Sequence, residues 1–256
     1  MKKIKYFCQY IVIIFLFTLY KSLGLKLSLI LSSKIFKLVG PIVRKNQISE
    51  QNLAYAFKNI NNEIKQKIIK DMWANYGKIF AEYMFIKDFR NDPKISKKIN
   101  IENKEILEKI KNNSEPVVFI SGHFNNFEFM AMQIEKYGID LATIYRPLNN
   151  IFLNPFMVYL RKKYICKNQI EKGLSGTRKA IEFIKKNHSI ALMVDQRLGE
   201  SERYPFFRKT AHTTTLPAQL AIKFNCDIFF SMGCSSFSSL LSLGAKINEV
   251  VPVGSH

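Results

Sequence analysis

The longest apolar run of the sequence lies near its beginning. It is "YFCQYIVIIFLFTLY" (residues 6–20), and lysines interrupt the equally apolar "KSLGLKLSLILSSKIFKLVG" (residues 21–40) that follows. With 15 residues, the run is shorter than the ~20 that a perpendicular transmembrane helix needs. A cleavage site of small residues, as in a secretory signal peptide, does not follow. We therefore expect a membrane anchor, either a short span with snorkelling Lys and Tyr residues or a helix lying in the interface.

Apolar residues recur at helical spacing farther along the chain. In residues 61–86 they lie four apart, at Ile64, Ile68, Met72, Tyr76, Phe80 and Met84. This spacing predicts an amphipathic helix. Further helical segments are predicted at residues 49–57, 104–113, 126–137, 151–164, 177–187 and 216–225.

Short β-branched apolar runs form a third pattern, which is typical of buried strands. They lie at residues 116–121, 141–145, 189–194 and 227–232. Because these runs alternate with helical segments, the sequence predicts an α/β fold with a mainly parallel mixed sheet flanked by helices. The predicted organisation is a basic, hydrophobic membrane-anchoring helical segment over residues 1–45 and one catalytic domain over residues 46–256.

The net charge of the chain indicates what kind of partner it binds. The chain has a formal net charge of +19, and no Asp or Glu occurs between Met1 and Ser49. Such an excess favours a polyanionic partner, either nucleic acid or an anionic membrane. The sequence contains no recognised nucleic-acid-binding motif, and its aromatic residues fall at core spacing. We therefore expect an anionic membrane and no nucleic acid.

The four cysteines suggest neither a disulfide framework nor a metal site. Cys8, Cys166, Cys226 and Cys234 are widely separated and show no C-x-x-C spacing. Paired spacings of that kind are the usual signature of zinc sites and disulfide-rich domains. We interpret these residues as reduced cysteines without a functional role.

Candidate chemistry lies where the strand predicted at 116–121 ends. His123 follows this strand, and Glu128 comes five positions later. Ligands of open α/β sheets gather at the carboxyl ends of strands. If a helix begins near Asn125 or Asn126, Glu128 lies in its first turn and can reach back to the imidazole. A His oriented by a carboxylate acts as a general base.

The same spacing has a structural alternative. His123 would then be a hydrogen-bonded residue at a strand end, and Glu128 an acid favoured by the helix dipole. In the catalytic interpretation, the absence of a G-x-S-x-G turn indicates that a substrate hydroxyl attacks directly. The acyl donor must then be activated already, as a thioester is.

The stretch "SGHFNNFE" (residues 121–128) resembles the H-x-x-x-x-D/E signature of the late acyltransferases of lipid A biosynthesis, the lauroyl/myristoyl type. Further blocks continue the resemblance: "NLAYAF" (52–57), "MWANYGKIFAEY" (72–83), "IYRPLNN" (144–150), "SGTRKAIEFIKKN" (175–187), "LMVDQR" (192–197) and "YPFFRKTAHTTTLPAQLA" (204–221). It extends to about residue 232. From about residue 233 onward the sequence is atypical for the family, through divergence or truncation.

The resemblance implies a glycerolphosphate-acyltransferase-like fold and transfer of a fatty acyl chain from acyl carrier protein to a hydroxyl of Kdo-bearing lipid IVA. The implied place is the cytoplasmic side of the inner membrane of a Gram-negative bacterium. Acyl carrier protein, the lipid A precursor and inner-membrane lipids are the implied partners. Acyl-acyl carrier protein is a co-substrate, and no cofactor or metal is expected. Two alternatives stay open: acylation of another membrane lipid, a glycerophospholipid or a glycosylated inositol lipid, and an inactive membrane-attached member.

The matching blocks also suggest binding residues around the catalytic pair. Asn125 or Asn126, or backbone N–H groups opening the next helix, are expected to stabilise the thioester oxyanion. Arg146 and Arg178 match arginines of the family and are candidates for holding phosphate or pantetheine by paired hydrogen bonds. Their alternative is an ion pair or a solvated face.

Three further candidates come from the later blocks. Asp195 follows the strand at 189–194 as His123 follows the strand at 116–121, which favours a place in the same cleft, although Asp at a strand end is also a common turn former. Thr213 and Thr215 match threonines of the family. We expect them to line a site for phosphate or the acyl chain.

Overall fold

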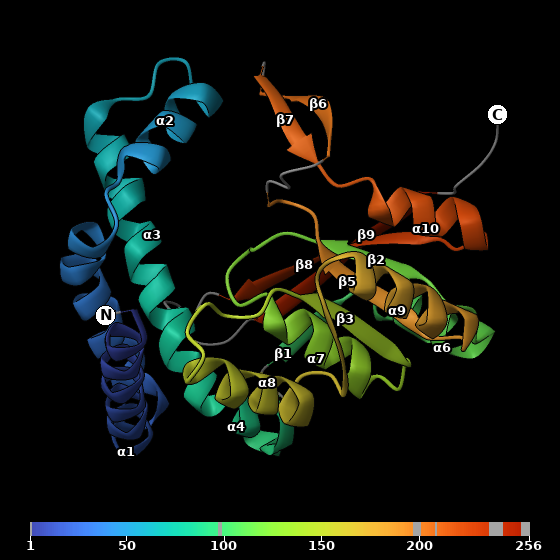
Figure 1. The fold of residues 1–256 in the computed structure, drawn as a ribbon, viewed down its shortest axis with the longest axis horizontal. Coiled ribbons are helices and arrows are strands. Elements are labelled where there is room, and N and C mark those ends of the chain that lie inside the picture. The colour runs from blue at the N-terminus through green and yellow to red at the C-terminus, as the bar shows by residue number, and fades with distance from the viewer. Residues whose placement is uncertain (1, 97–98, 197–200, 208, 236–242, 252–256) are drawn as a thin grey trace. The chain divides into compact units, whose positions relative to one another are not determined.

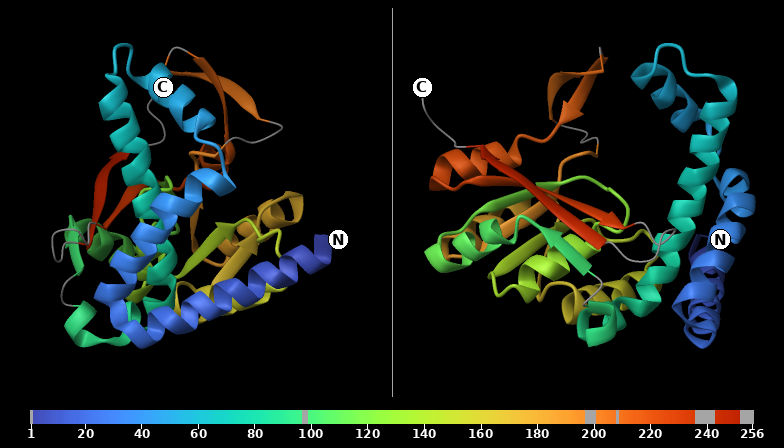
Figure 2. Two further views of the ribbon diagram at one scale, coloured as in Figure 1. Left: turned by 90° about the vertical axis from the view of Figure 1, so that its left-hand side faces the viewer. Right: turned by 180° about the vertical axis from the view of Figure 1, so that it is seen from behind.

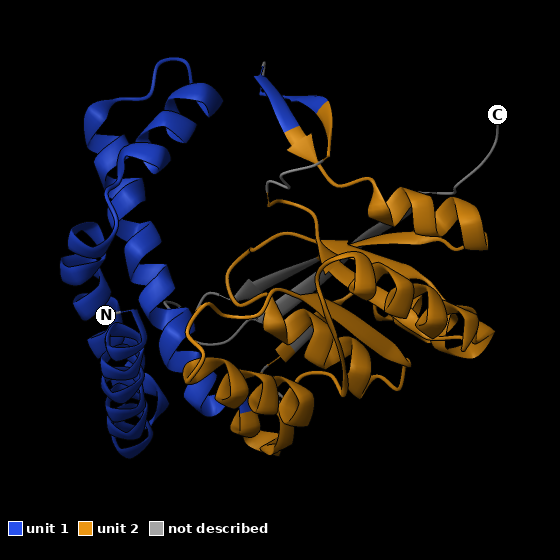
Figure 3. Ribbon diagram, viewed as in Figure 1, with its two compact units in different colours: residues 1–86, 204–211 blue, residues 87–203, 212–256 orange. Residues whose placement is uncertain are grey.

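The computed structural model describes residues 2–96, 99–196, 201–207, 209–235 and 243–251. The chain forms two compact units, residues 1–86 with 204–211 (unit 1) and residues 87–203 with 212–256 (unit 2) (Figure 3). Each unit has buried apolar residues of its own. The division predicted from the sequence, at residue 45, stays a prediction about the roles of the two segments.

Unit 1 is built on the long helix α1 (Lys2–Val43). Gly24 interrupts it with a φ of +75°, so α1 consists of two helical segments joined at a kink. Among the described residues, α1 is the helix that is long and apolar enough to cross a membrane. Several of its large apolar side chains are exposed, including Phe15 at 65% and Ile42 at 83%. The predicted N-terminal apolar helix that could anchor in a membrane is thus confirmed.

Helix α3 (Asn62–Glu82) packs along α1. At Gly77 the two helices approach so closely that a Cβ atom would lie 2.4 Å from the backbone oxygen of Ser32. A glycine is therefore needed at this crossing. The hydroxyl of Ser32 donates to the Gly77 carbonyl at 2.6 Å and joins the helices. Unit 1 also contains α2 (Gln47–Ala56) and the 3₁₀ turn η1 (Tyr83–Phe85).

Unit 2 contains a seven-stranded sheet with the order β1-β9-β8-β2-β5-β3-β4 (Figure 1). Its strands are β1 (Ile99–Glu102), β2 (Val118–Ser121), β3 (Leu141–Tyr145), β4 (Asn168–Glu171), β5 (Ser189–Met193), β8 (Ile228–Ser235) and β9 (Leu243–Val251). The five strands from β8 to β4 are parallel. β9 pairs antiparallel with β8 and parallel with β1 (Figure 2). The predicted α/β fold with a mainly parallel mixed sheet is confirmed.

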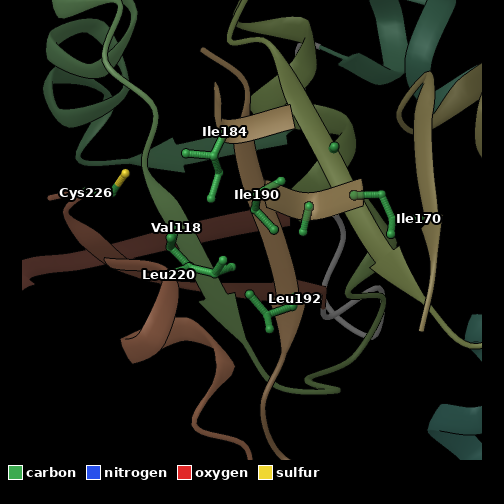
Figure 4. Close-up of a cluster of buried hydrophobic side chains, with 9 residues drawn as sticks. Val118, Ile170, Ile184, Ile190, Leu192, Leu220 and Cys226 are labelled. Carbon is green, nitrogen blue, oxygen red and sulfur yellow. The ribbon is translucent and has the colours of Figure 1, made fainter. Parts of the chain in front are cut away.

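Helices flank this sheet (Figures 1 and 2). They are α4 (Ile86–Asn91), α5 (Pro93–Ser96), α6 (Lys104–Asn113), α7 (Glu128–Lys136), α8 (Leu153–Tyr164), α9 (Leu174–Lys185) and α10 (Leu216–Phe224). One core cluster joins strands β2, β3, β4 and β5 to α9 and α10 (Figure 4). Val118, Ile190 and Leu220 are at most 2% exposed in it. This packing fixes the positions of the carboxyl ends of the strands relative to one another. The candidate site described below lies at these ends.

A hairpin of β6 (Glu202–Phe206) and β7 (Lys209–Thr213) forms a separate two-stranded sheet. All five residues of β6 are exposed. The hairpin was not predicted, because its sequence combines a proline with several charged residues and lacks a buried apolar run. The atypical segment that begins near residue 233 includes β9, and its residues 236–242 and 252–256 lie outside the described part of the chain.

Candidate active site

Two parallel strands bring His123 and Asp195 together. Ser121, the last residue of β2, lies opposite Met193, the last residue of β5. The chain continues for two residues beyond each strand, to His123 and Asp195, at the carboxyl edge of the sheet. Because the strands are parallel and in register, these two residues emerge side by side.

The carboxylate of Asp195 binds His123 at two points. Its Oδ1 lies 2.7 Å from Nδ1 of the imidazole, and its Oδ2 accepts a hydrogen bond from the backbone N–H of His123, also at 2.7 Å. With Nδ1–H donating to the carboxylate, Nε2 carries the lone pair and can accept a proton. The side chains of His123 and Asp195 are 32% and 41% exposed, so a substrate can reach them.

Two neighbours surround the imidazole. The ring of Phe127 contacts it edge to face, with centroids 4.5 Å apart. The side-chain amide nitrogen of Gln196 lies 3.1 Å from Nε2, where its N–H can donate to the ring. An acceptor hydroxyl that gives its proton to Nε2 therefore has to displace this amide, whose side chain is exposed at the edge of the site.

Glu128 has a different environment. It opens α7, and its carboxylate accepts hydrogen bonds from Nε of Arg161 at 2.8 Å and lies 2.7 Å from Nη2. Both side chains are nearly buried, 9% exposed for Glu128 and 11% for Arg161. The carboxylate that hydrogen-bonds the imidazole is thus Asp195, while that of Glu128 forms an ion pair with Arg161. A part for Glu128 in the reaction stays a prediction.

The helix start explains this difference. The sequence predicted a helix beginning near Asn125 or Asn126, but α7 begins at Glu128. Asn125 has a left-handed φ of +46° and forms part of the turn before it. The later start places Glu128 at the first helical position, beside Arg161 of α8.

Arg161 also contacts an aromatic residue of the site. Its guanidinium lies over the ring of Tyr145, with 5.6 Å to the centroid. The hydroxyl of Tyr145 donates to Oε1 of Glu171 at 3.1 Å. Burial raises the pKa of Tyr145, and the hydrogen bond to Glu171 raises it further, so the phenol stays neutral. Arg161 was not predicted from the sequence because "RKKY" at a helix end reads as basic residues favoured by the helix dipole.

His123, Glu128, Tyr145 and Arg161 line a cavity of about 810 Å³ within unit 2. Its wall includes apolar side chains at Phe127, Met130, Ile144, Leu148, Leu192 and Leu216, and cationic ones at Arg146, Arg161 and Lys172. Gly176 lies on the wall as well, and a Cβ there would come within 1.9 Å of the Glu171 carbonyl, so this close approach requires glycine. A cavity that is apolar on one part and cationic on another suits an anionic lipid.

Some of the site residues that were predicted from the sequence line this cavity, and others lie elsewhere in the structure. His123, Glu128, Arg146 and Thr215 line the cavity. Asp195 joins it through its hydrogen bonds to His123.

The other candidates have less direct positions. Asn126 is 1% exposed and therefore lies in the protein interior. Arg178 is exposed on α9, and Thr213 ends β7. The cavity lining described above includes neither of these two residues, nor Asn125. Their predicted contacts with substrate stay predictions. Among the described residues, no group of three or more His, Cys, Asp or Glu side chains is arranged to hold a metal ion.

The fold and the site together define the class, an α/β protein with a His–Asp pair at the carboxyl edge of a parallel sheet beside an amphiphilic cavity. The chain belongs to the bacterial lipid A biosynthesis acyltransferase family, whose model matches residues 1–232. The family supports an acyltransferase activity for this chain. No curated protein matches it.

Proposed function

We propose that this protein transfers a fatty acyl chain from the thioester of acyl carrier protein to a hydroxyl of a Kdo-bearing lipid A precursor. The observation that carries the proposal is the imidazole of His123, held by Asp195 at the wall of an amphiphilic cavity. Family membership supports the lipid A precursor as acceptor. The apolar helix α1 supports action at a membrane, which we assign to the cytoplasmic face of the inner membrane.

The reaction begins with proton transfer to the base. Nε2 of His123 takes the proton of the acceptor hydroxyl while that oxygen attacks the thioester carbonyl carbon. Asp195 stabilises the resulting imidazolium through Nδ1–H. The tetrahedral oxyanion then collapses, the C–S bond breaks, and the imidazolium returns the proton to the departing thiolate. The products are the acyl ester and the free thiol of the carrier.

The cationic wall is suited to the phosphorylated acceptor. Arg146, Arg161 and Lys172 line the cavity that contains His123. Guanidinium groups bind phosphate oxygens through paired hydrogen bonds, and Lys contributes a point charge. The buried carboxylate of Glu128 holds Arg161 in the wall. Without this carboxylate, the guanidinium charge of Arg161 would be uncompensated in a poorly solvated environment. Glu128 thereby acts as a positioning residue.

The proposal is tested with membranes that carry the full chain. They are given acyl carrier protein thioesters of several chain lengths and a tetra-acylated lipid A precursor, and the acylated product is quantified. The wild type and His188→Ala should form product, because His188 is not part of the cavity lining and hydrogen-bonds the Lys186 carbonyl. His123→Ala should form product far more slowly, at a residual rate that is still measurable. Equal product from His123→Ala and the wild type, or product with a glycerophospholipid acceptor alone, would contradict the proposal.

A further inference from the structure

The tip of the β6–β7 hairpin presents aromatic side chains to the outside. Tyr204, Phe206 and Phe207 are 45%, 63% and 56% exposed. The two phenylalanine rings contact each other edge to face, with centroids 4.6 Å apart. Phe207 has a left-handed φ of +46°, as a tight turn requires. A hairpin tip that exposes several large aromatic side chains marks a contact with a partner or a membrane.

Helix α2 contributes to the same surface. Residues 204–211 belong to unit 1, and Nζ of Lys209 lies over the ring of Tyr55, 5.2 Å from its centroid. Tyr55 is 52% exposed, and Phe57, directly after α2, is 54% exposed. We call Tyr55, Phe57, Tyr204, Phe206 and Phe207 the aromatic patch of unit 1.

The charge around this patch selects its occupant. Residues 44–58, 204–207 and 209–211 contain four basic residues (Arg44, Lys45, Lys58 and Lys209) and one acidic residue, Glu50. Aromatic rings and snorkelling lysines are both favoured at a membrane–water interface, and anionic headgroups attract basic residues. The apolar helix α1 belongs to the same unit, so this unit already holds the element suited to a bilayer.

We propose that the aromatic patch of unit 1 is a second membrane-contact surface, separate from α1. At this surface Phe206 and Phe207 insert into the interface of an anionic bilayer. The chain continues from β7 directly into Thr214, Thr215 and Leu216, which line the cavity. This inference does not depend on the identity of the acyl acceptor.

The test places a tryptophan at the tip of the hairpin in the full chain. Phe206→Trp and Tyr204→Trp are compared with Ile222→Trp on α10, whose isoleucine is 71% exposed in unit 2. Because the sequence contains one tryptophan, Trp73, its signal is removed by subtracting the emission of the wild type. Each protein is reconstituted into phosphatidylglycerol vesicles with and without brominated acyl chains. All three sites are exposed, so the substitutions leave the core intact.

The expected result is a blue shift and a loss of tryptophan emission to brominated lipid in Phe206→Trp and Tyr204→Trp, but not in Ile222→Trp. The loss should be smaller in phosphatidylcholine vesicles, which lack the anionic headgroup. Quenching of both hairpin variants no stronger than that of Ile222→Trp would overturn the proposal. A shift that requires added acyl carrier protein would also overturn it, since the occupant would then be a protein.

Discussion

Two neighbouring regions of unit 2 each hold a carboxylate close to a cation or a base, and they differ in almost everything else. At the carboxyl edge of β2 and β5, Asp195 is 41% exposed and hydrogen-bonds His123. At the start of α7, Glu128 is 9% exposed and forms an ion pair with Arg161. The first arrangement leaves a basic nitrogen accessible to substrate. The second stabilises the wall of the cavity.

The difference shows that strand register, not distance along the chain, selects the partner of the histidine. His123 and Glu128 are five positions apart, whereas His123 and Asp195 are 72 apart. Pairing of Ser121 with Met193 nevertheless brings the distant residue into contact. Changes at the two carboxylates should therefore have separate consequences, one for the rate of reaction and the other for stability.

The largest effect is expected for Asp195→Asn. Without the carboxylate, the imidazole loses the partner that fixes its tautomer and stabilises its charged form, and kcat should fall about 10³- to 10⁴-fold. The unfolding midpoint should change little, because this side chain is 41% exposed. Initial rates of acyl transfer per folded protein measure the effect, with Asp140→Asn, an exposed residue just before β3, as control. An Asp195→Asn variant with the wild-type rate would remove the distinction between the two regions.

The next effect in size concerns Glu128→Gln. Removal of one charge from a nearly buried pair leaves Arg161 uncompensated, and the free energy of unfolding should fall by about 3–5 kcal/mol. Denaturant titration of the purified protein measures this loss. A second variant that removes both charges, Glu128→Gln with Arg161→Met, should recover most of it. If Glu128→Gln unfolds like the wild type but turns over thousands of times more slowly, Glu128 belongs to the chemistry and not to the wall.

The two arginines predicted to bind substrate allow a smaller and sharper test of the wall. Arg146 lines the cavity, and Arg178 is exposed on α9. Loss of a charge-assisted contact with phosphate is worth about 1.5 kcal/mol, so Arg146→Gln should raise KM for the acceptor about tenfold with kcat nearly unchanged. Arg178→Gln should leave both constants as they are. The reverse outcome would move the phosphate site to α9.

The sequence predicted where the site lies, but it did not predict which side chains contact each other within the site. Strands β2, β3 and β5 were predicted because each is a β-branched apolar run buried in a parallel sheet. β1 ("INIE") and β4 ("NQIE") have four residues each, of which two and three are polar, so neither run stands out from a loop. The equivalent positions of His123 and Asp195 after their strands were visible in the sequence. Which carboxylate meets the imidazole depended on register and on the first residue of α7, which hydrophobic patterns locate only within a few residues.

The smallest expected effect comes from a buried thiol outside both regions. Burial raises the pKa of Cys166 to about 12, from 9.0 for a solvated thiol. Above pH 9 the unfolded state therefore loses this proton while the folded state keeps it, and stability falls as pH rises from 9 to 12. At pH 10 the loss should be about 1 kcal/mol relative to pH 8.

Unfolding titrations at pH 8 and pH 10, with Cys166→Ala as reference, measure this contribution. The difference between the two proteins isolates the thiol from lysines that titrate in the same range. If Cys166→Ala and the wild type lose the same stability between these pH values, the thiol of Cys166 is not protected by the fold.

The central claim is that His123 and Asp195 act as one catalytic unit. Its most direct test is a double-mutant cycle on the rate of acyl transfer to the lipid A precursor, with His123→Ala, Asp195→Asn and the variant that carries both changes. If Asp195 acts only through His123, removal of the histidine already abolishes the contribution of Asp195 to the rate. The double variant should then be no slower than His123→Ala alone. If the two losses multiply, Asp195 acts independently of the histidine, and the claim is contradicted.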